Sequence, residues 1–240
     1  MSDADSDLDT PEPGGFRARL WRWSKAAIRP VAIGLPVLLA LWYLGGALWV
    51  SKVDYDMDFE TPAADLPDHG SRAVAIAAAL IEREVDQNGW VANDPFFLPG
   101  SLLDNMPNFQ EGIIGALARF SFELTDQIGR TRGSSRADTD LQEAAGLLQY
   151  SGTKWIFDLS TSWAPTASSE AQYRKARRAL IAYNRRLADG KAVYERRADN
   201  LLSTLDRIAA DLGSSSAVLD REIAEHASDW IDLKADDLFY

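Results

Sequence analysis

The chain has 240 residues, of which 46% are hydrophobic and 25% charged, and its formal net charge is −11. This composition suits one or two globular domains, and the acidic balance excludes a nucleic-acid partner, because phosphate binding needs a dominant positive surface. The absence of cysteine excludes disulfides, thiolate nucleophiles and cysteine-based zinc sites.

The N-terminal part has the pattern of a membrane anchor. Residues 1–15 are acidic and contain two prolines and two glycines, which predicts a disordered tail. Residues 16–29 form a segment with five basic side chains, and residues 30–50 are uncharged and long enough to cross a bilayer as a helix. By the positive-inside rule the N-terminus is cytoplasmic and residues 70–240 lie outside. A cleaved signal peptide is the competing interpretation.

Residues 51–69 are expected to form an acidic linker. The stretch DYDMDFE (54–60) alternates acids as a calcium loop does, but its sixth position is Phe59, where the loop needs glycine for a sharp turn. Two prolines also disfavour helix in this segment. We therefore expect a charged linker without a bound cation.

From residue 70 onward the sequence predicts a mainly α fold, an exported helical bundle. Ser71 caps a helix that ends before Gly89, and Asp138 caps another. The expected helices span 71–88, 109–128 and 138–149. The run WIF (155–157) is interpreted as one buried extended piece.

The longest predicted element begins at Ser169, which forms a capping box with Gln172. Apolar or small residues then recur in steps of three and four as far as Leu212, with one stutter. This predicts a long heptad-patterned helix, provided that Gly190 does not break it. GSSS (213–216) is expected to end that helix and to cap the next.

The heptad seam is expected to face the interior and to pack on the helices at 71–88 and 109–128. Its principal members are Leu180, Tyr183, Leu187, Leu201, Leu205 and Ile208. If the seam is exposed instead, it is expected to pair with a second copy of the chain or with a partner helix, because so long an apolar stripe seldom stays in water.

The same helix is rich in arginine. The residues concerned are Arg174, Arg177, Arg178, Arg185 and Arg186. The favoured interpretation is that they face acidic neighbours within the domain. The alternative is that they bind anionic lipid headgroups or an envelope polymer. Arg178, Arg185 and Arg196 are expected to remain in contact with water.

The stretch LPGSLLDNMPNFQEGI (98–113) is neither helical nor alternating. Asn108 and Glu111 have the spacing of a capping box, which accounts for part of its polarity. Aromatic rings beside carboxylates and amides also suit a sugar or peptide cleft, because rings cover apolar sugar faces. The candidate cleft residues are Trp90, Asn93, Asp94, Asp104, Asn105, Asn108 and Glu111.

Familiar catalytic motifs are absent from the sequence, and no catalytic residue, metal or cofactor is expected. The two histidines are His69, in the linker, and His226, which shares a helix face with Glu222 and Asp229. That trio lacks the further strong ligand that a first-row metal usually needs.

Two segments carry a family resemblance: GWVANDPFFLPGSLLDNMPNFQEGI and YNRRLADGKAVYERRADNLLSTLDRIAADLGS. Together they resemble a family of uncharacterised, single-pass inner-membrane proteins of proteobacteria, a domain of unknown function, and LDNMPNFQ is the specific part. The resemblance implies an inner-membrane anchor and a periplasmic helical domain. It implies no activity, and it implies that the full domain continues past DDLFY.

Two classes of function fit these observations. The first is a membrane-anchored interaction or scaffold protein of the cell envelope, whose partners are the lipid bilayer and either an envelope protein or a second copy through the long helix. The second is a carboxylate-based glycan hydrolase or lyase acting on the cell wall, with two of Asp94, Asp104, Glu111 and Glu123 as acid and base.

Overall fold

The structure is a computed structural model. It describes residues 14–54, 59, 67–131, 138–157, 163–192, 194 and 198–226. These residues form helices and irregular segments and include no strand, so the predicted mainly α fold is confirmed. The chain divides into two compact units, Met1–Gly45 and Gly46–Tyr240.

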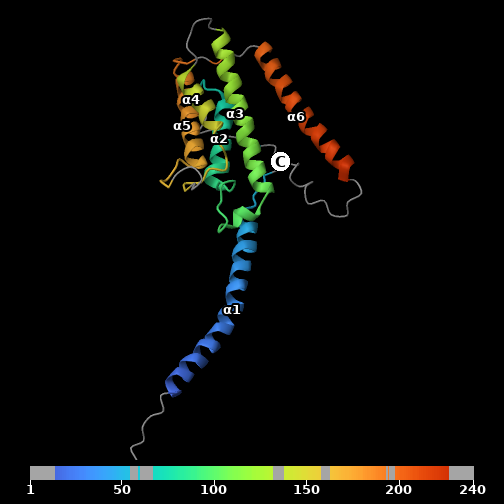
Figure 1. The fold of residues 1–240 in the computed structure, drawn as a ribbon. Helices are drawn as coiled ribbons and strands as arrows, with labels where there is room; N and C mark the ends of the chain where they lie inside the picture. The colour runs from blue at the N-terminus through green and yellow to red at the C-terminus, as the bar shows by residue number, and fades with distance from the viewer. Residues whose placement is uncertain are drawn as a thin grey trace, which may run out of the picture. The chain divides into compact units, whose positions relative to one another are not determined.

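The first element is α1, a helix over Gly14–Val50, drawn in blue in Figure 1. It includes the predicted basic segment as well as the apolar run. Within it, Ala32–Val50 has a mean hydropathy of 1.9 and is long and apolar enough to cross a membrane. Of the predicted disordered tail (1–15), residues 1–13 lie outside the described residues, whereas Gly14 and Gly15 are the first residues of α1, so the tail prediction is wrong for these two. Most of the predicted linker (55–58 and 60–66) also lies outside the described residues.

The helix expected at 71–88 is present. Ser71 caps α2, Arg72–Glu82, by accepting a hydrogen bond from the Val74 N–H. The helix continues as a π-helical turn, Arg83–Gln87, and the chain then leaves it at Gly89, whose φ is 81°. Glycine suits this position because it adopts positive φ without a steric cost.

The next helix, α3, spans Asn105–Thr131 and so begins earlier than predicted. Asp104 Oδ1 accepts a hydrogen bond from the first N–H of the helix at 2.8 Å, and its carbonyl oxygen accepts the N–H of Asn108 at 3.0 Å. The predicted capping box of Asn108 and Glu111 is therefore wrong. Pro107 fits inside the first turn, because N–H groups there have no intrahelical partner.

The helix α4, Thr139–Leu148, begins as predicted at Asp138, whose side chain accepts two backbone N–H groups. The segment after it differs from the expectation. Ile156 and Phe157 are 43% and 51% exposed, so the WIF run is an irregular surface loop. The Ile156 carbonyl oxygen accepts the N–H of Thr166 at 2.8 Å, which closes this loop on the chain just before the next helix.

The prediction of one long helix from Ser169 to Leu212 is wrong. The structure has two helices there, α5 (Ser169–Ala188) and α6 (Ala198–His226). They are separated at Gly190, whose φ is 70°. A left-handed residue cannot continue a right-handed helix, so the heptad pattern runs across a break in the backbone.

Both predicted ends of the long helix also need correction. Ser168, not Ser169, caps α5 and accepts a hydrogen bond from the Ala171 N–H, so the box with Gln172 does not form. The GSSS stretch lies inside α6, where Ser215 Oγ donates to the Asp211 carbonyl oxygen at 3.0 Å. Serine that bonds one turn back is compatible with a continuous helix.

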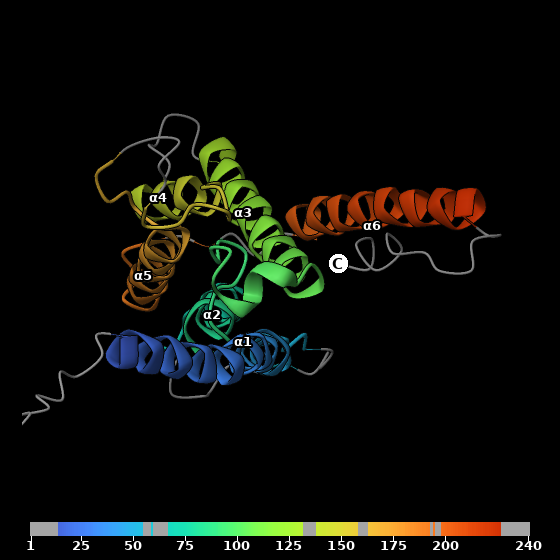
Figure 2. The same ribbon diagram turned by 60° about the horizontal axis from the view of Figure 1, so that its bottom comes forward.

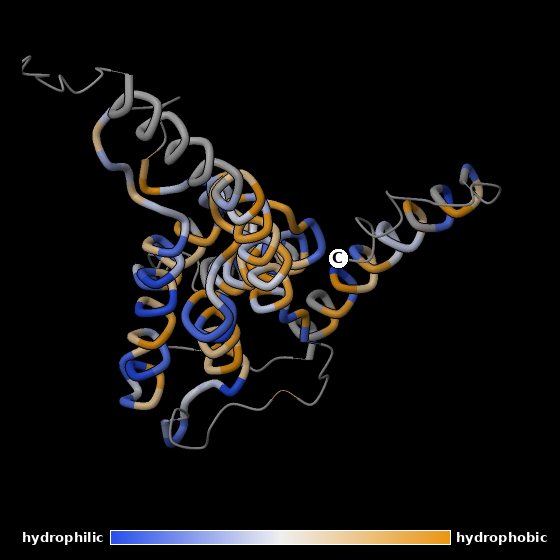
Figure 3. Tube along the Cα trace, turned by 90° about the horizontal axis from the view of Figure 1, so that it is seen from below, coloured by the Kyte–Doolittle hydropathy of each residue, from blue (hydrophilic) through white to orange (hydrophobic). Residues whose placement is uncertain are grey.

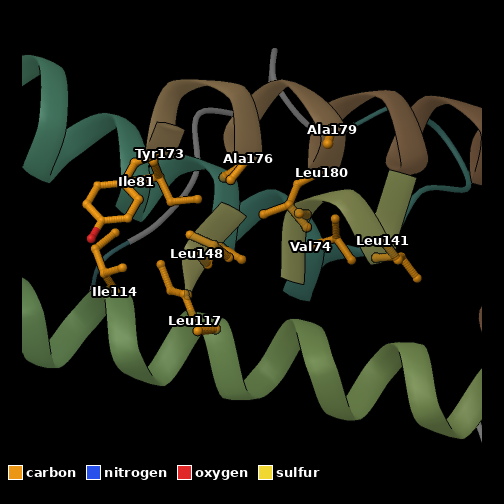
Figure 4. Close-up of a cluster of buried hydrophobic side chains, with 14 of the residues drawn as sticks. Val74, Ile81, Ile114, Leu117, Leu141, Leu148, Tyr173, Ala176, Ala179 and Leu180 are labelled. Carbon is orange, nitrogen blue, oxygen red and sulfur yellow. The ribbon is translucent and has the colours of Figure 1, made fainter. Parts of the chain in front are cut away.

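The core is formed by α2, α3, α4 and α5, which lie side by side in Figures 1 and 2. Figure 4 shows their apolar side chains pointing toward one another. The labelled members are Val74, Ile81, Ile114, Leu117, Leu141, Leu148, Tyr173, Ala176, Ala179 and Leu180. In both ribbon views, α6 lies outside this group of four helices.

The seam prediction holds for α5 and fails for α6. Leu180 and Tyr183 are fully buried, and Leu187 packs against the same core. Leu205 and Ile208 are 52% and 49% exposed. The Leu201 side chain lies outside what the structure describes.

Candidate functional site

Three of the predicted cleft residues, Trp90, Asn93 and Glu111, contact the loop after α4, and a fourth, Asp94, lies against Gly100. Trp90 is buried, and its Nε1 donates a hydrogen bond to the Gly152 carbonyl oxygen at 2.8 Å. Its ring meets the ring of Tyr173 edge-on, with centroids 4.9 Å apart. Glu111 Oε1 lies 2.5 Å from the point where a Cβ atom on Gly152 would stand. A larger residue at this position would require the Glu111 side chain to move.

Asn93 belongs to the same group. Its Nδ2 donates to the Lys154 carbonyl oxygen and to Glu170 Oε2, each at 2.9 Å. Its Oδ1 is buried and has no hydrogen-bond partner among the described residues. The side chain thus ties the loop before α3 to the loop before α5, and it faces inward.

Two carboxyl groups of this site, those of Asp94 and Glu111, have pKa values above their ordinary range. The pKa of Asp94 is raised to about 6: burial is the main cause, a hydrogen bond from the Gly100 N–H opposes it, and the charge of Glu170 adds to it. Burial also raises the pKa of Glu111. Asp94 is half-buried, whereas Glu111 is exposed. A raised carboxyl pKa is a property of general acids and of structural carboxyls alike.

The other three predicted residues lie at the start of α3. Asp104 is exposed and serves as the helix cap. Asn105 Oδ1 is buried without a partner in the described part of the chain. Asn108 is half-buried within the first turn. Contacts therefore join Trp90, Asn93 and Glu111 to the loop after α4, whereas the side-chain contact of Asp104 is with the first N–H of α3.

Two aromatic residues next to the predicted cleft residues Asn93 and Asp94 face outward, unlike the buried Trp90. Phe96 and Phe97 are 83% and 46% exposed. Phe97 meets the ring of Trp155 at 5.8 Å between centroids, and Trp155 meets Phe157 at 5.6 Å. We call residues 95–103 and 155–157, together with Trp163, the aromatic loops.

Sequence reasoning missed the partners that complete the site. Glu170 and Tyr173 lie at the start of α5, more than 55 residues after the predicted stretch ends at residue 113. Tyr173 OH donates to the Tyr150 carbonyl oxygen at 2.8 Å, and burial raises its pKa, as do Glu111 and Glu170. No local pattern in the sequence signals that these residues meet.

A separate apolar hollow lies between α3 and α6. Its volume is about 680 Å³, and Phe120, Phe122, Ile208 and Leu212 are among its lining residues. At its edge Arg119 Nε forms an ion pair of 2.9 Å with Asp211 Oδ2. Figure 3 shows hydrophobic residues recurring along α6.

Three of the five arginines considered in α5 follow the favoured interpretation. Arg174 pairs with Asp86 at 2.6 Å, and Arg177 pairs with Glu82. Arg186 bonds the carboxylates of Asp138 and Asp140 at the start of α4. Arg178 and Arg185 are exposed, as predicted, and Arg196 lies outside the described residues.

In the part of the chain that the structure describes, no three His, Cys, Asp or Glu residues are grouped so that they could hold a metal ion. Asp229, a member of the trio considered around His226, is not among those residues.

A model of the bacterial family described as an uncharacterized protein conserved in bacteria (DUF2333) matches residues 28–237. The chain belongs to the DUF2333 family. No curated protein and no solved structure matches this DUF2333 chain. The family assignment agrees with the resemblance noted in the sequence and adds no activity.

Proposed function

We propose that this DUF2333 protein is a membrane-anchored interaction module of the bacterial cell envelope, and that a second copy of the chain binds α6. The observation that carries the proposal is a row of exposed apolar side chains along that helix. They are Leu202, Leu205, Ile208, Leu212 and Ile223, each between 49% and 66% exposed. An apolar stripe of this kind usually marks an interaction surface.

The spacing favours a second copy as the occupant. From residue 202 to 223 the face follows steps of three and four, which is the repeat of a coiled coil. Its members are Leu202, Leu205, Ala209, Leu212, Ser216, Leu219 and Ile223. In an antiparallel pair centred near Ser214, Ala209 faces Leu219 of the second copy and Ser216 faces Leu212, so each small side chain lies opposite a large one. This self-complementarity is what a two-fold interface requires.

Cysteine cross-linking in intact membranes tests this pairing, because the chain has no cysteine of its own. Ala209→Cys/Leu219→Cys should form a disulfide-linked dimer. These two positions are ten residues apart on one helix, too far for an internal bond, since a helix rises about 1.5 Å per residue. Ala210→Cys/Ala217→Cys, outside the seam, is the matched control. Equal cross-linking of both pairs, or of neither, would refute the proposal.

The anchor in this proposal is Ala32–Val50, preceded by five basic residues. The positive-inside rule then leaves the N-terminus in the cytoplasm and the helical domain in the periplasm. A periplasm-active reporter fused after Glu60 should be active, and a cytoplasm-active reporter at the same point should be silent. The opposite pattern would refute the orientation.

A second candidate function is a carboxylate-based glycan hydrolase or lyase. The observation in its favour is the pKa of Asp94, which burial raises to about 6, so that a fraction of this carboxyl is protonated near neutral pH and can act as a general acid. Release of soluble fragments from purified peptidoglycan, lost in Asp94→Asn and retained in Asp104→Asn, would support this candidate. No release by the unaltered protein would reject it.

A further inference from the structure

We infer that the aromatic loops insert into the interfacial layer of the same membrane that holds α1, so that the domain has a second attachment to the lipid. This inference rests on the proposed anchor function. It assigns a role to the apolar part of the 98–113 stretch that neither helix capping nor a ligand cleft explains.

The aromatic loops expose large apolar groups at their tips. Phe96, Leu102 and Trp163 are 83%, 66% and 89% exposed. Residues 95–103 and 155–157 contain no charged side chain. Aromatic and apolar side chains without charge partition into the membrane interface, where an aromatic ring lies at the level of the headgroups.

The rings of Phe96, Phe97, Trp155 and Phe157 form one connected surface. Phe96 and Phe97 have centroids 5.5 Å apart, and Phe97 leads on to Trp155 and Phe157. Thr166 Oγ1 donates to the Trp155 carbonyl oxygen at 3.1 Å, which brings the segment after Trp163 beside the same loop. The two aromatic loops therefore make up a single patch rather than scattered exposed residues.

This patch lies where the candidate span ends. Within the unit Gly46–Tyr240, the Pro99 ring occupies the position that a Cβ atom on Gly46 would take, so the last turn of α1 meets the 95–103 loop. Four residues beyond Val50, Asp54 Oδ2 pairs with Arg83 Nη1 at 2.8 Å. Four extended residues reach about 13 Å, so the domain is attached close to the membrane surface.

Lipid fits this patch better than a glycan does. A sugar site needs polar groups beside the rings to bond hydroxyls, but the neighbouring Asn93 is buried and donates to Lys154 and Glu170 within the domain. Trp49 is 76% exposed, and Lys52 Nζ lies 5.6 Å from its ring centroid. A tryptophan beside a lysine at the end of the span is typical of an interfacial anchor. The aromatic loops extend this interfacial surface.

Site-specific quenching of the full-length protein in phospholipid vesicles tests the inference. Single cysteines at Phe96, Trp163, Leu44 and Phe122 are labelled with the fluorophore NBD, and the vesicles carry a nitroxide near the lipid headgroup. Phe96→Cys and Trp163→Cys should lose most of their emission, as should Leu44→Cys in the span. Phe122→Cys, 59% exposed on α3, is the matched control and should keep its emission.

The outcomes separate this inference from the proposed function. Quenching at Leu44→Cys without quenching at Phe96→Cys and Trp163→Cys overturns the inference and leaves the anchor standing. Absence of quenching at Leu44→Cys overturns the anchor itself. A blue shift at Phe96→Cys on addition of peptidoglycan fragments, without lipid quenching, overturns the lipid assignment in favour of a glycan. Because Phe96 and Trp163 are exposed, these replacements leave the core intact, which circular dichroism verifies.

Discussion

Gln110 holds the backbone of Val91 in place: its Oε1 accepts the Val91 N–H at 3.0 Å, and both residues are buried. The same side chain donates from Nε2 to the carbonyl oxygens of Gly89 and Glu84 at 2.8 and 3.1 Å. One carboxamide in α3 thus satisfies three backbone groups at the end of the π-helical turn, and it positions the loop that carries Trp90.

Replacing Gln110 with leucine should therefore destabilise the protein strongly. The change keeps the approximate volume but leaves buried backbone groups without partners, which should cost at least about 2 kcal/mol. Urea unfolding of the full-length protein in micelles, followed by circular dichroism, measures this cost. Gln142→Leu, on the exposed face of α4, is the control and should fall within about 0.5 kcal/mol of the unaltered protein. Equal effects would show that the Gln110 contacts contribute little.

The cap of α3 gives a second prediction. Asp104→Ala removes the side chain that accepts the first N–H of the helix, and it should cost on the order of 1 kcal/mol. Asp104→Ser and Asp104→Asn should restore most of the loss, because both can cap. Asn108→Ala should cost less than Asp104→Ala in the same unfolding assay. A larger cost for Asn108→Ala would indicate that Asn108 caps the helix, as the sequence predicted.

The raised pKa of Asp94 predicts that the stability of the protein depends on pH. The fold raises its pKa from 3.8 to about 6, so the folded state binds this proton more tightly than the unfolded chain does. The resulting stabilisation is fully present below pH 3.8 and is lost as the pH rises through 6. Asp94→Asn should therefore stabilise the protein most near neutral pH, and this advantage should shrink toward about pH 4. An advantage that does not change with pH would contradict the raised pKa.

The arginines of α5 give a matched pair. Arg186 bonds two carboxylates at the start of α4, whereas its neighbour Arg185 is exposed. Arg186→Ala should cost about 1 kcal/mol, and the cost should decrease at high salt because the network is partly solvated. Arg185→Ala should stay within about 0.5 kcal/mol. If the two variants behave alike at low salt, the ion-pair network has no net effect.

The sequence predicted the features that depend on local chemistry. Ser71 and Asp138 cap helices as expected, and Gly89 ends one. The long helix was wrong because periodicity records which face is apolar and does not record whether the backbone is continuous. Gly190, identified as the weak point, adopts positive φ and separates α5 from α6.

The site was predicted in part for a related reason. Trp90 and Asn93 belong to it, but their partners Gly152 and Glu170 come from distant segments, and a single sequence contains no signal that such groups meet. The sequence showed aromatic residues beside carboxylates and amides, but it did not show whether their side chains point inward or into solvent. Whether Phe96 points into a cleft or into solvent depends on the packing of the whole domain, and it is 83% exposed.

The central claim is that two copies of the chain pair through α6. Its most direct test is the number of chains per particle, measured by native mass spectrometry on the full-length protein in nanodiscs. The unaltered protein should contain two copies. Leu205→Asp/Leu212→Asp, which places charge on the exposed face of α6, should contain one copy with unchanged helix content, because neither side chain belongs to the core. A single copy for the unaltered protein, or two copies for the variant, would contradict the account.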